Sequence, residues 1–156
     1  PIISYNYGAQ KPDRMKRTMK LGVMVGCSIM VFCLAIMQVF PGQILKIFDA
    51  TDEMLLMGIP AVRIMSTAFI FAGFSVTCSG MFQAVGKGVY SMIVSMARQL
   101  FVILPVAYFL SKAMNSVNGV WAAFPIAEVF SVIISTIFLL RVYKKIVKPM
   151  ESVQRD

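Results

Sequence analysis

Three charged residues lie within long apolar stretches of this 156-residue chain: Arg63, Arg98 and Glu128. A charged side chain at the centre of a bilayer costs about 3 kcal/mol unless it is paired or faces water. Arg63 and Glu128 are predicted to lie at a similar depth, each about ten residues from the same end of its helix. One interpretation is a structural ion pair that joins the two helices. In the other, Glu128 is the ion-coupling residue, which binds a proton or a cation, and Arg63 tunes it.

Arg98 lies in a separate apolar stretch, about ten residues from the opposite face of the membrane. Its long side chain is expected to reach towards the headgroups at that face. Gln83 is predicted close to the same face, where it either hydrogen-bonds across helices or lines a cavity. The structural role, a hydrogen bond across helices, is the favoured one of the two. Asn6 is the second polar candidate for helix packing or for a cavity wall.

No other group of side chains suggests chemistry. The sequence has no histidine, and Cys27, Cys33 and Cys78 all lie in apolar stretches. This placement argues against a disulfide framework and against a metal site. The sequence also lacks a glycine-rich phosphate loop and a recognisable pairing of nucleophile and base. We therefore expect neither enzymatic activity nor a cofactor.

The elements that carry the three intramembrane charges are predicted to be transmembrane helices. Hydrophobic residues make up 58% of the sequence and charged residues 14%, whereas a soluble domain carries about 25% charged residues. Apolar stretches of about 20 residues are long enough to cross a bilayer as helices. The predicted fold is an all-α integral membrane protein with four transmembrane helices, at about residues 21–41, 54–85, 89–111 and 119–143.

The net charge of +8 could suggest a nucleic-acid-binding protein, but the basic residues flank the apolar stretches, which favours contact with anionic lipid headgroups. One group lies in a predicted cytoplasmic loop over residues 10–20. The other follows the last helix, in a predicted cytoplasmic tail over residues 144–156 that is disordered beyond Pro149. The positive-inside rule then predicts a multi-pass protein of the plasma (inner) membrane with both ends cytoplasmic. The expected lipid contacts are Lys11, Arg14, Lys16, Arg17, Lys144 and Lys145.

Four segments of the sequence match, in their order and spacing, parts of one known family of membrane proteins. They are residues 1–9, then Gln83 to Lys87, then Arg98 and Gln99 followed by Pro105, and finally Gly119, Val120 and Trp121 followed by Pro125 and Glu128. Together they resemble the C-terminal lobe of multidrug and toxic compound extrusion (MATE) transporters. In this resemblance the four segments correspond to the end of the second helix of that lobe, the end of its fourth helix, its fifth helix and its sixth helix. Residues 1–9 are accordingly interpreted as the end of a truncated transmembrane helix.

The resemblance implies a twelve-helix antiporter made of two six-helix lobes around a central cavity. Residues 21–143 would then be the four-helix part of the C-terminal lobe, after the end of helix eight. Such transporters use a proton or sodium gradient to expel cationic, lipophilic compounds. The implied partners are the lipid bilayer, these small substrates and the N-terminal lobe of the same protein. Glu128 matches a position in the last helix that is often acidic in the family.

Two alternatives remain open. The same superfamily architecture also carries lipid-linked oligosaccharides across membranes, and a flippase of that kind would be expected to hold several arginines in its groove. The other alternative is a non-transporting membrane subunit of four helices that acts by assembly. The start at Pro1, in the middle of a predicted helix, argues against a complete small protein of this second kind.

Overall fold

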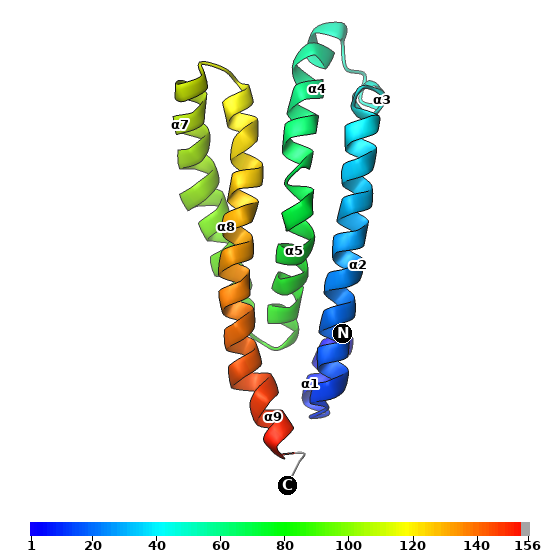
Figure 1. Cartoon of the computed structure of the whole chain (residues 1–156), viewed down its shortest axis with the longest axis vertical. Coiled ribbons are helices and arrows are strands. Elements are labelled where there is room, and N and C mark those ends of the chain that lie inside the picture. Colours follow the sequence, from blue (N-terminus) through cyan, green and yellow to red (C-terminus); the bar gives the residue numbers. More distant parts are fainter. Residues whose placement is uncertain (154–156) are drawn as a thin grey trace.

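The computed structural model describes residues 1–153, and these fold into helices joined by short turns, with no strand among them. The long helices run side by side along the long axis of the molecule (Figure 1). In chain order the helices are α1 (Ile2–Gly8), α2 (Pro12–Val39), α3 (Pro41–Ile47), α4 (Asp52–Ser66), α5 (Phe69–Ala84), α6 (Gly88–Met96), the π-helical segment η1 (Ala97–Ile103), α7 (Leu104–Met114), α8 (Asn118–Val142), the π-helical segment η2 (Tyr143–Val147) and α9 (Lys148–Val153).

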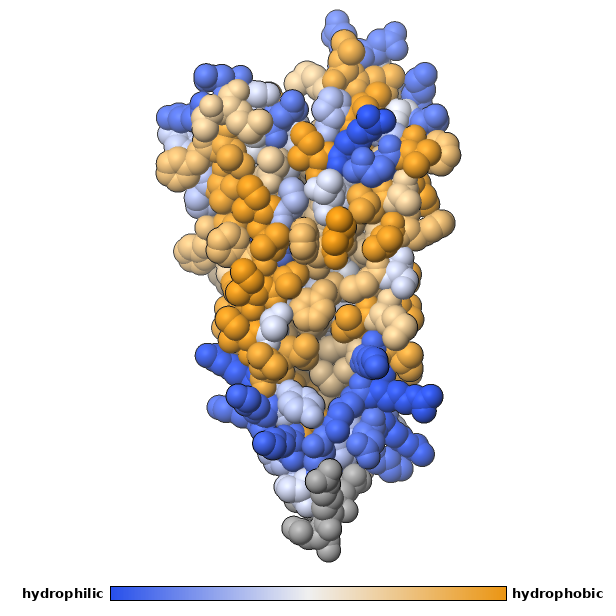
Figure 2. All heavy atoms as spheres, in the orientation of Figure 1, coloured by the Kyte–Doolittle hydropathy of each residue, from blue (hydrophilic) through white to orange (hydrophobic). Residues whose placement is uncertain are grey.

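The predicted class of an all-helical membrane protein is confirmed. Three continuous helical stretches are long and apolar enough to cross a bilayer: Pro12–Val39, Gly88–Met114 and Asn118–Ser152. A fourth crossing is formed if α4 and α5, whose axes bend by 54° at the break between them, count as one broken span. Figure 2 shows the apolar side chains gathered in a broad belt around the bundle, with hydrophilic side chains at both of its ends.

The span predicted as one helix over residues 54–85 is instead broken between α4 and α5. At the break, Thr67 donates to the carbonyl of Ile64 through both its backbone N–H (3.3 Å) and its hydroxyl (2.6 Å). Short i→i+3 bonds of this kind tighten and end a helix. From α2, the Gln38 amide donates to the carbonyl of Arg63 (2.8 Å) and to the Ser66 hydroxyl (3.0 Å). A neighbouring helix therefore satisfies polar groups that lie next to the bend.

Both predicted basic segments outside the helices are more ordered than expected. Most of the predicted loop over residues 10–20 is the first part of α2, because Pro12 occupies a favourable first helical position and Asp13 lies in the first turn. The predicted tail over residues 144–156 continues as η2 and α9 to Val153, and its expected disorder beyond Pro149 is wrong for residues 150–153. Val147 and Met150 are buried, and Lys16 of α2 pairs with Glu151 of α9. Residues 154–156 lie outside the described part.

The core is concentrated towards the end of the bundle that carries both termini (Figure 1), where Met15, Met81, Phe82 and Val142 are almost fully buried. Farther along, α2 and α5 approach each other closely at two glycines. A Cβ atom on Gly73 would lie 2.9 Å from the Cα of Cys27, and one on Gly26 would lie 2.4 Å from Oγ1 of Thr77. Small residues allow membrane helices to pack this tightly.

We expect Gly73→Ala to lower the free energy of unfolding by about 1–3 kcal/mol, because the added methyl group meets backbone atoms that cannot move aside easily. Gly80→Ala is the matched control on the same helix, since a Cβ there meets nothing within 4 Å. The control should leave stability unchanged or raise it by up to about 1 kcal/mol. Unfolding in detergent, followed by circular dichroism, measures both; equal losses would show that α2 and α5 do not pack as described.

Candidate functional site

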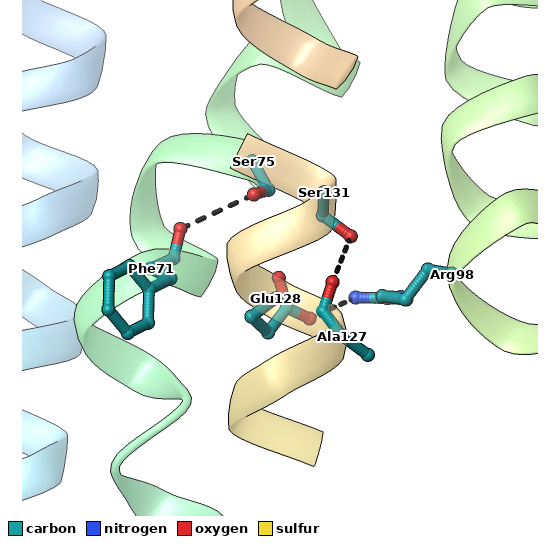
Figure 3. Close-up of polar contacts among 6 residues, drawn as sticks. All are labelled: Phe71, Ser75, Arg98, Ala127, Glu128 and Ser131. Atoms are coloured by element: carbon teal, nitrogen blue, oxygen red, sulfur yellow. Dashed lines mark hydrogen bonds and ion pairs between the residues drawn. The ribbon is translucent and has the colours of Figure 1, made fainter. Parts of the chain in front are cut away.

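The buried charges of the bundle meet where η1 lies against α8. Nη1 of Arg98, on η1, donates to Oε1 of Glu128, on α8, at 2.5 Å (Figure 3). Glu128 is only 7% exposed, whereas the Arg98 side chain is 32% exposed. The carboxylate is therefore the buried partner of this ion pair, and its charge in the apolar bundle depends on the guanidinium.

The wide turn that carries Arg98 has a local cause. Pro105 follows η1 closely and has no N–H to donate to the carbonyl four residues earlier, and its ring crowds that carbonyl. Widened π turns occur where the regular α-helical bonding is interrupted, and often at functional sites. The Arg98 side chain leaves the helix from within this widened stretch, next to α8.

On α8, Glu128 follows directly after one member of a stripe of small residues. Every fourth position from 119 is small and buried, which allows neighbouring helices to approach α8 closely: Gly119, Ala123, Ala127, Ser131 and Ser135. At the far end of the stripe, a Cβ on Gly119 would lie 2.5 Å from the carbonyl oxygen of Leu110 in α7. The stripe was not singled out from the sequence, although its four-residue period could have revealed it.

The ion pair uses one carboxylate oxygen of Glu128 and one terminal nitrogen of Arg98. Within the described residues, Oε2 of Glu128 and Nε of Arg98 have no partner. The nearby hydroxyls do not fill these places, because Ser131 donates to the carbonyl of Ala127 (3.1 Å) and Ser75 to that of Phe71 (3.4 Å), as Figure 3 shows. A buried carboxylate oxygen with a free lone pair is a place where a proton or a small cation can bind.

The pair lines a cavity of about 380 Å³ at the bend between α4 and α5. Apart from Arg98 and Glu128, the lining is mostly apolar and includes Met37, Phe69 and Phe124. Arg98 also lines a second cavity of about 380 Å³, whose other walls are largely polar. The polar lining residues of this second cavity are Ser75, Ser79, Gln83, Ser91, Ser95 and Ser131.

The predicted pairing of Arg63 with Glu128 is wrong. Arg63 is exposed on α4 and forms no salt bridge with any residue of the 1–153 range, and Arg98 takes its predicted place. Arg98 correspondingly turns to α8 instead of reaching for headgroups. Matching two residues by depth leaves the rotation of each helix undefined, so it cannot show whether their side chains face each other.

The other predicted site residues are not brought to Glu128. Nε2 of Gln83 donates to the hydroxyl of Ser91 (3.1 Å), which ties α5 to α6, and Gln83 also lines the polar cavity. Nδ2 of the buried Asn6 donates to the carbonyl of Ile2 (2.8 Å) within α1. Lys16 contacts Asp13 as well as Glu151. The remaining predicted lipid contacts are all exposed: Lys11, Arg14, Arg17, Lys144 and Lys145.

With this geometry established, comparison with known proteins identifies the family. The family model MatE matches residues 1–109. The chain belongs to the MatE family. Its structure also matches a solved structure titled "Inward-facing conformation of a multidrug resistance MATE family transporter of the MOP superfamily", with a TM-score of 0.84, 18% identity and coverage of 97% of this chain and 34% of that one. That likeness confirms the fold.

Two further proteins that are similar to this chain carry names that refer to multidrug transport. This MatE chain is 26% identical to the "Multidrug export protein MepA" of Staphylococcus haemolyticus (strain JCSC1435) over 122 residues. The aligned region covers 78% of this chain and 26% of that protein. A solved structure of the "MATE multidrug transporter DinF-BH" matches with a TM-score of 0.78 and 31% identity, over 92% of this chain and 31% of that one. The chain thus spans about a quarter to a third of the length of these relatives.

In this MatE chain we expect Arg98→Gln to lower the free energy of unfolding by about 3 kcal/mol, because it leaves a buried carboxylate without its partner. Glu128→Gln should cost less, since the Arg98 left behind is partly exposed. Arg63→Gln removes an exposed arginine and should change stability by less than about 0.5 kcal/mol. Thermal unfolding in detergent ranks the three variants; a loss in Arg63→Gln as large as that in Arg98→Gln would refute the assigned pair.

Proposed function

We propose that this chain is part of a multi-pass plasma-membrane transporter that exports cationic, lipophilic compounds in exchange for H⁺ or Na⁺. In this proposal it supplies the last helices of the C-terminal lobe of a twelve-helix, two-lobe antiporter, with its C-terminus in the cytoplasm. The observation that carries the proposal is the half-satisfied Glu128 carboxylate at the wall of an apolar cavity. Membership of the MatE family and the multidrug export names of the relatives support it.

The cavity suits the proposed substrates in two respects. Its mostly apolar lining, with Met37, Phe69 and Phe124, would accept lipophilic compounds of different shapes, because methionine and aromatic side chains repack around varied ligands. Its only acidic lining residue is Glu128, within the part of the chain that the structure describes. A lipophilic cation in the cavity would therefore be attracted to the same carboxylate that receives the coupling ion.

Competition for Glu128 gives a physical basis for exchange. Arg98 occupies Oε1 and leaves Oε2 open. When a proton or Na⁺ binds at Oε2, Glu128 no longer balances the charge of Arg98. The net positive charge then left at the cavity wall repels a cationic substrate, and the two ligands cannot be held together. Neutralising Glu128 also weakens its bond to Arg98, which frees the segment η1 to move relative to α8. In this way ion binding is linked to the arrangement of the helices.

We expect Glu128→Gln in the full-length transporter to abolish gradient-driven efflux of a cationic lipophilic dye, because a neutral amide can neither gain nor lose the coupling charge. Glu53→Gln, which neutralises an exposed carboxylate in the first turn of α4, is the matched control and should retain efflux. Dye efflux from cells measures both variants. An uncoupler and Na⁺ removal, applied separately to the unmodified protein, identify the ion. Wild-type efflux by Glu128→Gln at every pH would exclude the coupling role.

A further inference from the structure

A separate cavity, here called the basic cavity, lies near the end of the bundle that carries both termini. It has a volume of about 380 Å³ and is bounded by four different helical elements and one loop. Three cationic side chains line it: Lys87 from the loop between α5 and α6, Arg141 from α8 and Lys145 from η2. Tyr7 of α1 and Tyr90 of α6 complete its polar lining. Segments far apart in the sequence thus bring three positive charges to one hollow.

Within residues 1–153, no carboxylate forms an ion pair with these cations. Among residues 1–153 the ion pairs are Lys16 with Asp13, Lys16 with Glu151, and Arg98 with Glu128, so none includes a side chain of the basic cavity. The cavity also has no acidic lining residue within that range. Positive charges gathered in one hollow add to one another's field and attract an anion.

The side chains of the cavity rest on a rigid aromatic support. The ring of Tyr90 stacks on that of Phe138, with 4.5 Å between centroids and an angle of 11°. The fully buried Phe82 packs edge-on against both rings. The guanidinium carbon of Arg141 lies 5.7 Å from the centroid of Phe138. A cation–π contact of this kind holds the guanidinium in place and leaves its N–H groups available for an oxyanion.

The loop residue is placed by a specific turn. Gly86 has a φ of +73°, a left-handed conformation that glycine adopts without strain. This turn lets the backbone N–H of Lys87 donate to the carbonyl of Phe82 at 2.7 Å. Lys87 is therefore tied to the same aromatic support as Tyr90 and Arg141.

We propose that the basic cavity binds a phosphate ester. Lys87, Arg141 and Lys145 neutralise its charge, and the hydroxyls of Tyr7 and Tyr90 donate hydrogen bonds to its oxygens. The hydrophilic end of the bundle adjoins the apolar belt (Figure 2), which is where the headgroup of a phospholipid lies. An anionic phospholipid such as phosphatidylglycerol is therefore the favoured source of this phosphate, and free phosphate is the other source of the same chemistry.

Native mass spectrometry of the delipidated full-length transporter tests the site, with phosphatidylglycerol or phosphatidylcholine added in steps. We expect the combined variant Lys87→Gln and Arg141→Gln to weaken binding of the first phosphatidylglycerol at least about tenfold. The matched control removes the same number of charges from exposed lysines that lie outside the basic cavity and are not among the expected lipid contacts, through Lys20→Gln and Lys148→Gln. It should weaken that first binding step little. Equal losses in the two combined variants would mean diffuse attraction to the surface and would overturn the proposal.

Two further arms keep the test decisive. Tyr90→Phe keeps the stacked ring and removes one hydroxyl, so it should bind phosphatidylglycerol several-fold more weakly without loss of thermal stability. Unchanged lipid binding in this variant and in Tyr7→Phe would overturn the role of the hydroxyls.

In the second arm, inorganic phosphate is added as a competitor for the lipid. If millimolar phosphate displaces the first lipid from the wild-type protein, the site is confirmed and its source is soluble phosphate. If phosphate has no effect, the lipid headgroup is the ligand.

Discussion

Burying a carboxylate inside an apolar helix bundle is costly unless a cation pairs with it, and Arg98 is that cation for Glu128. The pair joins η1 to α8, and the two segments must pack closely for a bond of 2.5 Å to form. The widened turn before Pro105 and the small residues around Ala127 make that approach possible. The same pair supplies the charge at the wall of the apolar cavity. The structure of the site therefore follows from the need to stabilise one buried charge.

The rest of the bundle combines close helix packing with a cavity. Gly26 and Gly73 bring α2 against α5, and the small-residue stripe brings neighbouring helices against α8. The bend at Thr67 turns α4 away from the line of α5, and the cavity lies at this bend. The amide of Gln38 satisfies polar groups next to the bend, so that the break is stable in apolar surroundings. Packing and cavity are thus produced by different local features of the same helices.

Much of the fold could be predicted from the sequence, because apolar stretches long enough to cross a bilayer have few alternatives to helix. That Glu128 and Arg98 lie within the apolar bundle was also predictable, since both stand in long apolar stretches of the sequence. Their pairing was not predictable, because depth along a helix axis says nothing of rotation around it, and depth alone pairs Glu128 with Arg63. The bend lies at Ser66 and Thr67, two small polar residues in an otherwise mostly apolar stretch, without a glycine or a proline at the break to signal it. The basic residues after Pro12 form a helix instead of the predicted loop, and Pro12 and Asp13 are typical of such a helix start.

Exchange of the two charges tests the Arg98–Glu128 pair most directly. Arg98→Glu and Glu128→Arg, each made alone in the full-length protein, place two like charges together in the bundle, whereas the combined variant restores an ion pair with the opposite orientation. Thermal unfolding in detergent compares the three with the wild type. The account predicts that each single variant is strongly destabilised and that the combined variant recovers most of the loss. If the combined variant is no more stable than the less stable of the two single variants, the Arg98–Glu128 pair is contradicted.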